Sequence, residues 1–106
     1  MADTHIKGAR LADEIRDNLA AWTARDYPGS FVVITGVTLS HNLRYATVWV
    51  RILGNDPEGV FKKLQKGTRH YQHRLVVTLT RFKLPFISFT LDQRPDEETT
   101  LGTLPN

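Results

Sequence analysis

The segment Phe61–Leu75, FKKLQKGTRHYQHRL, decides the fold because it has the pattern of a helix interrupted once, at Gly67. On a helical wheel of about 100° per residue, the apolar side of this segment and its flanks holds Val60, Phe61, Leu64, Tyr71, Leu75, Thr78 and Leu79. The opposite side holds Lys62, Lys66, Arg69 and His73, with Lys63, His70 and Arg74 on the shoulder. Glycine inside a helix costs about 1 kcal/mol relative to alanine. Keeping one apolar face across such a residue predicts two helices that meet at a corner at Gly67, with Arg69 pointing away from the core.

The segments before this pair predict one helix and two strands. The first helix begins at a cap on Asp3 or Thr4 and ends before DYPGS, residues 26–30. Its apolar positions recur near 3.6 residues and are Ile6, Leu11, Ile15, Leu19 and Trp22. Residues 31–40 and 44–53 are rich in β-branched residues, and their short link predicts an antiparallel hairpin with a bulge near Gly36. Both strands carry apolar outer positions, so partial cover is expected on each face of the sheet.

The remaining chain adds a turn, a third strand and a tail. Asp56 and Pro57 in GNDPEG are a typical helix start, and the helical region that follows ends before residue 83. Residues 85–92 predict the third strand. The order α-β-β-α-(kink)-α-β predicts a small α+β domain, with helices packed on one face of a three-stranded sheet. We assign residues 1–93 to this domain and residues 94–106 to a short polar tail.

Composition excludes several classes of protein. A chain of 106 residues forms one modest core. It has no cysteine, so disulfides and cysteine-ligated metal sites are excluded. Its apolar runs are far shorter than the roughly 20 residues that cross a bilayer. We therefore expect a cytoplasmic protein without membrane contact.

The charge distribution predicts an anionic partner. The net charge is +3, and no acid lies between Glu58 and Asp92. That interval holds half of the 14 Lys and Arg residues: Lys62, Lys63, Lys66, Arg69, Arg74, Arg81 and Lys83. Solvated helix faces usually mix charges, because like charges four residues apart repel. Binding of a polyanion would relieve that repulsion, because Lys and Arg take the place of the counterions at its phosphates. The pattern therefore favours contact with nucleic acid over a merely solvated face.

The same residues give little support for catalysis or metal binding. His70 and His73 share a helix side, but two ligands without a nearby carboxylate leave a metal site incomplete. The carboxylates at residues 13–14 and 96–98 lie on a polar helix face and in the tail, where no shaped pocket for acid–base work is expected. Trp22 is expected in the core. Trp49 can either pack under a helix or the tail, or remain exposed as a platform for a base.

Four short motifs resemble a known family. The helix–turn–helix beside a three-stranded sheet resembles a KH domain, although the usual GxxG loop is replaced by residues 67–70, GTRH. The segments that carry the closer resemblance are DYP followed by FVVITGVTLS (26–40), SHNLRYATV (40–48), LQKGTR (64–69) and PFISFTLD (85–92). They resemble ribosome-binding factor A, a KH-like family in which an interrupted helix bearing Ala-x-Gly replaces the loop. Gly67 stands at the family's alanine and Arg69 at its glycine, and Asn42 replaces a usual aspartate.

The resemblance implies a non-catalytic assembly factor with no cofactor and no small-molecule substrate. Such a factor binds the immature small (30S) ribosomal subunit and its 16S rRNA and assists late maturation; it is expected to be a monomer. The RNA-binding residues expected from the basic segment are Lys62, Lys63, Lys66, Gly67, Arg69, His70, His73 and Arg74, extended by Arg81, Lys83 and Arg44. Two alternatives remain open: a general KH-like RNA-binding module unconnected with ribosomes, and a protein–protein adaptor with a basic face.

Overall fold

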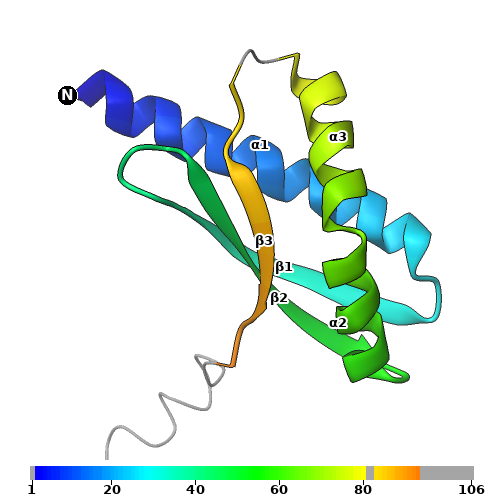
Figure 1. The fold of residues 1–106 in the computed structure, drawn as a ribbon. Coiled ribbons are helices and arrows are strands. Elements are labelled where there is room, and N and C mark those ends of the chain that lie inside the picture. The colour runs from blue at the N-terminus through cyan, green and yellow to red at the C-terminus, as the bar shows by residue number, and fades with distance from the viewer. Residues whose placement is uncertain (1, 81–82, 94–106) are drawn as a thin grey trace, which may run out of the picture.

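The chain folds into three helices and a three-stranded sheet in the order that the sequence predicts (Figure 1). The computed structural model describes the backbone of residues 2–80 and 83–93, and the side chains of the same ranges from residue 8 onward. The elements are α1 (Ala2–Asp26), β1 (Ser30–Leu39), β2 (Tyr45–Gly54), α2 (Pro57–Lys66), α3 (Thr68–Leu79) and β3 (Phe86–Leu91). The α+β class and the helical corner are therefore confirmed.

The sheet has the order β1-β2-β3, antiparallel between β1 and β2 and parallel between β2 and β3. Strand β2 is central and alternates strictly, with Ala46, Val48, Val50 and Ile52 buried. The register of β1 on β2 shifts between Ile34 and Gly36, which confirms the predicted bulge. Parallel pairing of β2 with β3 requires a crossover connection, and the basic helix pair provides it.

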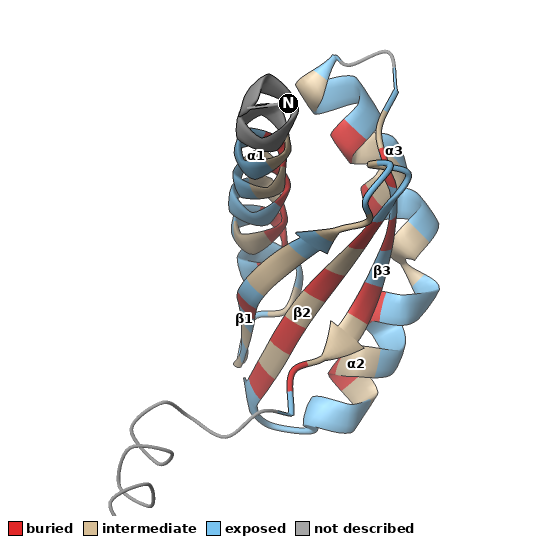
Figure 2. Cartoon of the chain, turned by 90° about the vertical axis from the view of Figure 1, so that its left-hand side faces the viewer, coloured by how far each residue is buried: buried red, intermediate tan, exposed pale blue. Residues whose placement is uncertain are grey.

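The core lies between the buried face of the sheet and the layer of helices. Helix α1 packs on β1, while α2 and α3 pack on β2 and β3. Figure 2 shows α1 on one side of this helical layer and the helix pair on the other. The side chains buried to 2 % exposure or less include Ile15 and Leu19 of α1, Val48 and Val50 of β2, and Leu64, Tyr71 and Leu75 of the helix pair. Trp22 is 8 % exposed, so its predicted place in the core is confirmed.

Expected cover on both sheet faces is not what the structure shows. All three helices lie on one face, and among the described residues nothing shields the large apolar side chains of the other face. Those side chains are 44–69 % exposed and are Phe31, Val33, Tyr45, Leu53 and Phe86. Apolar residues at the outer positions of a strand indicate a contact surface, but the sequence does not say whether the contacting group belongs to the same chain.

Two other predictions about helix limits are wrong. Helix α1 already includes Ala2, so neither Asp3 nor Thr4 is its cap. Helix α3 ends at Leu79, where Thr80 adopts a left-handed conformation with φ 47°, rather than continuing toward residue 83. Its last turn is also less buried than the wheel predicts, since Thr78 is exposed. The side chain of Ile6 and the tail assigned to residues 94–106 lie outside the described residues.

Candidate nucleic-acid interface

A single residue, Gly67, forms the corner between α2 and α3. Its N–H donates back to Lys63 O (2.9 Å) and Leu64 O (3.1 Å), while its carbonyl accepts from Tyr71 N (3.0 Å). The hydroxyl of Thr68 donates to Gln65 O at 2.8 Å and thereby satisfies a carbonyl near the end of α2. The corner is consequently a hydrogen-bonded turn that fixes the angle between the two helices.

The glycine is favoured at this corner by space rather than by backbone angles. Gly67 has φ −88° and ψ 6°, which other residues also adopt. A Cβ added there would lie 3.3 Å from Lys63 O and 3.7 Å from Tyr71 Cε2. That contact is tight but requires a movement of only a few tenths of an ångström, so the corner has room for an alanine.

The basic side chains predicted from the wheel share the solvent side of the helix pair. Six of them are exposed: Lys62, Lys63, Lys66, Arg69, His70 and His73. Arg69 lies in the first turn of α3, next to the corner, and points away from the core as expected. No side chain caps the start of α3, so its first backbone N–H groups add positive potential beside these residues. The result is a cationic surface on the helix pair, with no carboxylate in α2 or α3 after Glu58.

Arg74 differs from the other predicted basic residues because it is engaged within the fold. Its guanidinium lies 4.2 Å from the centroid of the Trp22 ring and 3.8 Å from Asp26 Oδ2. The same carboxylate accepts a hydrogen bond of 2.5 Å from the hydroxyl of Tyr71. These contacts join the end of α1 to α3. Arg74 therefore positions the helix pair, with a side chain that is still 32 % exposed.

Burial of this junction perturbs its tyrosines. The pKa of Tyr71 lies far above the ordinary value, first because burial disfavours the phenolate and second because its proton is held by Asp26. Burial also raises the pKa of Tyr27, against a lowering effect of its hydrogen bond with Tyr71. Both hydroxyls stay protonated at neutral pH and act as hydrogen-bonding groups, with no indication of acid–base chemistry.

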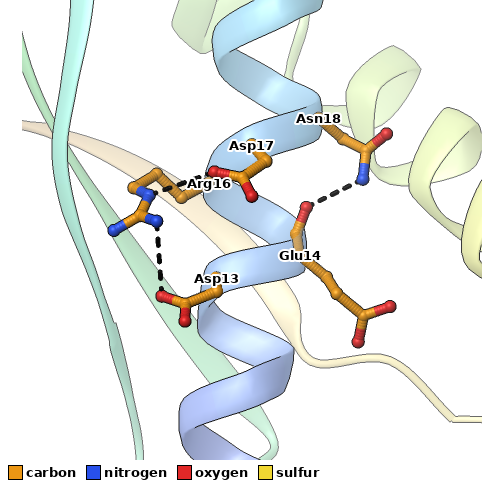
Figure 3. Close-up of polar contacts among 5 residues, drawn as sticks. All are labelled: Asp13, Glu14, Arg16, Asp17 and Asn18. Carbon is orange, nitrogen blue, oxygen red and sulfur yellow. Dashed lines mark hydrogen bonds and ion pairs between the residues drawn. The ribbon is translucent and has the colours of Figure 1, made fainter.

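Asp13, Glu14 and Asp17 lie along α1, where Asp13 and Asp17 contact Arg16 of the same helix (Figure 3). Arg16 contacts Asp13 at 3.5 Å and Asp17 at 3.3 Å, and all three side chains are between 45 % and 71 % exposed. Asn18 Nδ2 donates to Glu14 O at 2.8 Å. These carboxylates form solvated helix contacts rather than a pocket, and no group of three or more potential metal ligands occurs among the side chains that the structure describes.

The three remaining candidate residues lie outside the helix pair or outside the described residues. Arg44 is exposed and ends the β1–β2 loop, where its N–H donates to Ser40 Oγ and Asn42 Oδ1, both at 3.1 Å. Asn42 Oδ1 also accepts from the hydroxyl of Ser40 at 2.8 Å, so this side chain holds the loop through its oxygen. Lys83 is exposed just before β3, and Arg81 lies outside the described residues. Arg44 and Lys83 thus lie outside the helix pair itself, in the β1–β2 loop and just before β3.

Sequence reasoning did not single out the aromatic residues beside Arg44. Tyr45 and Phe86 are paired in the register of β2 and β3, with ring centroids 6.2 Å apart. The only sequence signal was their place at outer strand positions. Trp49 lies on this same open face, half-buried, and its Nε1 donates to Thr38 Oγ1 at 2.9 Å. Packing of Trp49 under a helix is wrong, because the helices lie on the other face of the sheet, and cover by the tail lies outside the described residues. No described helix is long and apolar enough to cross a membrane.

Fold and surface together define a small KH-like α+β domain that presents a kinked, basic helix pair. Comparison with known proteins gives the family. The sequence model of ribosome-binding factor A matches residues 7–104. The chain is 32 % identical over 96 residues to ribosome-binding factor A of Anaeromyxobacter dehalogenans strain 2CP-C, covering 85 % of this chain and 70 % of that protein. It is 31 % identical over 88 residues to the Staphylococcus epidermidis factor, covering 81 % and 75 %. The chain belongs to the ribosome-binding factor A family.

Solved structures share the fold. The crystal structure of ribosome-binding factor A from Thermus thermophilus superposes with a TM-score of 0.65 at 22 % identity, covering 78 % of this chain and 93 % of that one. A homology model of the Thermus thermophilus factor, fitted into a cryo-electron microscopy map of a 30S complex, gives a TM-score of 0.67 at 22 % identity, covering 79 % and 94 %. At this identity the likeness establishes the architecture alone.

Proposed function

We propose that this protein is a non-catalytic assembly factor that binds the immature small ribosomal subunit through its 16S rRNA and assists late maturation. The observation that carries the proposal is the acid-free solvent face of α2 and α3, where six basic side chains are exposed around the corner at Gly67. Membership of the ribosome-binding factor A family supports the ribosomal partner. The complex of the Thermus thermophilus factor with a 30S subunit supports the same choice of subunit.

The helical face suits phosphates better than bases. Its residues are mostly Lys and Arg on long side chains, which gain affinity by releasing counterions and read little sequence. The rigid corner fixes the spacing between Lys62 and Lys66 on α2 and Arg69 on α3, so the surface can match the shape of a folded RNA. Arg74 contributes less to this contact because Trp22 and Asp26 already hold it. The protein acts as a cytoplasmic monomer in this proposal.

Sedimentation of cell extracts tests the proposal. A tagged full-length chain is expected to travel with small-subunit particles that carry unprocessed 16S rRNA and to be absent from translating ribosomes. The matched variants are Lys62→Ala/Lys66→Ala/Arg69→Ala on the helix pair and Arg10→Ala/Arg16→Ala/Arg25→Ala on α1, which remove the same charge from exposed positions. Only the first triple variant should leave the small-subunit fractions.

Two results would replace the proposal with its alternatives. Equal competition by unrelated RNA would support a general RNA-binding module. A complex that survives nuclease treatment and contains no ribosomal RNA would support a protein–protein adaptor.

A further inference from the structure

The open face of the sheet holds an exposed aromatic pair that the helical interface does not use. Tyr45 is 59 % exposed and Phe86 is 67 % exposed, with ring centroids 6.2 Å apart at an interplanar angle of 38°. An aromatic side chain left in water loses the stabilisation that burial would give it. Two such rings side by side, tilted by 38°, expose an apolar aromatic surface at this end of the sheet.

The backbone around the pair is held firmly. Phe86 N donates to Arg44 O at 2.8 Å, and Tyr45 N donates to Ser40 Oγ at 3.0 Å. Gln72 of α3 accepts from Ile87 N at 2.8 Å and donates to Pro85 O at 2.9 Å, which fixes the start of β3 against the helix. The backbone that carries the rings is therefore fixed before any ligand arrives, so binding orders only the two side chains.

The surroundings of the pair are basic and hydroxylic. Arg44 precedes Tyr45, Lys83 precedes Phe86 by three residues, and both are exposed. Thr47 and Ser88 are the next paired residues on the open face and can donate to or accept from base edges. Trp49 follows after Thr47, about 13 Å along the strand from Tyr45 at about 3.3 Å per residue. A hollow beside Trp49 is lined by Gly36, Val37, Thr38, Thr90, Leu91, Asp92 and Gln93.

Charge favours RNA over a protein at this end of the face. Residues 27–55 and 59–91 contain no acid, and these two runs include the whole sheet. The other exposed apolar residues of this face, which would suit a protein-docking patch, lie at its opposite end, where Phe31 pairs with Leu53 and Val33 follows. Unpaired bases stack on aromatic side chains, and their phosphates are held by nearby Lys and Arg.

We propose that Tyr45 and Phe86 form a stacking platform for an unpaired base of single-stranded RNA, with Arg44 and Lys83 as phosphate contacts. It is a second RNA contact, on the face of the sheet opposite the helices. It rests on the proposed function only in taking RNA as the partner. A single-stranded segment and a folded rRNA surface can then be held at the same time.

Binding of short RNA by the isolated full-length protein tests the platform. The probe is a labelled single-stranded eight-nucleotide RNA of mixed sequence, followed by fluorescence anisotropy across a salt series, with a duplex of the same length for comparison. The variant Tyr45→Thr/Phe86→Thr keeps β-branched residues at exposed strand positions, and circular dichroism checks its fold. We expect at least a five-fold loss of single-strand affinity, because one stacked base contributes about five-fold or more.

Four further readouts separate stacking from other causes. The salt dependence of the variant should match that of the wild type, because stacking releases no counterions. Duplex affinity should be unchanged, and the exchanged pair Tyr45→Phe/Phe86→Tyr should retain single-strand binding. The control variant Phe31→Thr/Leu53→Thr, at the other end of the same face, should also bind as the wild type does.

Several outcomes would overturn the platform. They are wild-type protein that does not bind the oligonucleotide, unchanged affinity in the threonine variant, and equal loss in the Phe31 control. Loss of ribosomal-particle binding by the threonine variant with normal oligonucleotide binding would mean that the face contacts a protein instead. Failure of the proposed function is a separate result, because wild-type protein absent from small-subunit fractions could still bind the oligonucleotide through this pair.

Discussion

Removing three positive charges from the helix pair should change the salt dependence of RNA binding by a predictable amount. Lys62, Lys66 and Arg69 are exposed and lie on both sides of the corner at Gly67. Each phosphate contact contributes about 0.7–0.9 to the slope of log affinity against log salt concentration. If all three side chains contact phosphates, Lys62→Ala/Lys66→Ala/Arg69→Ala should flatten that slope by about 2–3.

The slope converts directly into affinity. If variant and wild type bind equally at 1 M salt, where the electrostatic contribution is small, a slope difference of about 2–3 gives roughly 100- to 1000-fold weaker binding at 0.1 M. Stability should change by no more than about 0.5 kcal/mol, because these are exposed positions and alanine is a good helix former. The variant should therefore stay folded while it loses affinity.

The assay is filter binding or anisotropy with 16S rRNA transcripts between 0.05 and about 1 M salt. The variant Arg10→Ala/Arg16→Ala/Arg25→Ala loses the same net charge from α1 and serves as the control. Its slope should stay close to that of the wild type. An unchanged slope in the helix-pair variant, or an equal decrease in both variants, would refute phosphate contact at α2 and α3.

Three further predictions concern the fold that carries this surface. Gly67→Ala should change the free energy of unfolding by less than about 1 kcal/mol, since the gain in helix propensity offsets a 3.3 Å contact of the new Cβ with Lys63 O. Gly54→Ala should lower the free energy of unfolding by about 1–3 kcal/mol in urea titrations, because Gly54 has φ 105° and a Cβ there would lie 3.0 Å from the carbonyl oxygen of Gly29. Arg74→Ala should lower stability by about 1–2 kcal/mol through loss of its ring and carboxylate contacts, with a smaller change in salt slope than Arg69→Ala. The raised pKa of Tyr71 means that the native state keeps a proton that the unfolded chain loses above pH 10. The free energy of unfolding should therefore fall above that pH by up to about 1.4 kcal/mol per pH unit. Tyr71→Phe should remove this contribution, and the same dependence of unfolding free energy on pH in variant and wild type would contradict it.

Local patterns were enough to predict the architecture. The alternation along residues 46–52 identifies a strand with one buried face, and the mid-strand Gly36 marks the bulge. The corner at Gly67 was predictable because a helix breaker inside a constant apolar face is typical of two helices joined at a turn. Asp56 and Pro57 likewise identify the start of α2, where Asp56 accepts from Gly59 N at 3.2 Å.

The parts that sequence did not predict depend on contacts between distant residues. Arg74 looks like any other basic residue of its segment, and its role becomes visible only when folding brings Trp22 and Asp26 of α1 against it. The pairing of Tyr45 with Phe86 depends on parallel register between strands that a helix pair separates. The early start of α1 could not be predicted from a capping residue, because the helix already includes Ala2, before Asp3 and Thr4.

The central claim is that the helix-pair surface contacts 16S rRNA of the immature small subunit. Ultraviolet crosslinking in cells, with both the RNA nucleotides and the protein peptides mapped, tests it most directly. The account predicts crosslinks from peptides spanning residues 61–75 to defined positions of 16S rRNA in small-subunit precursors. Crosslinks confined to other RNAs, or to other parts of this protein with residues 61–75 free, would contradict it.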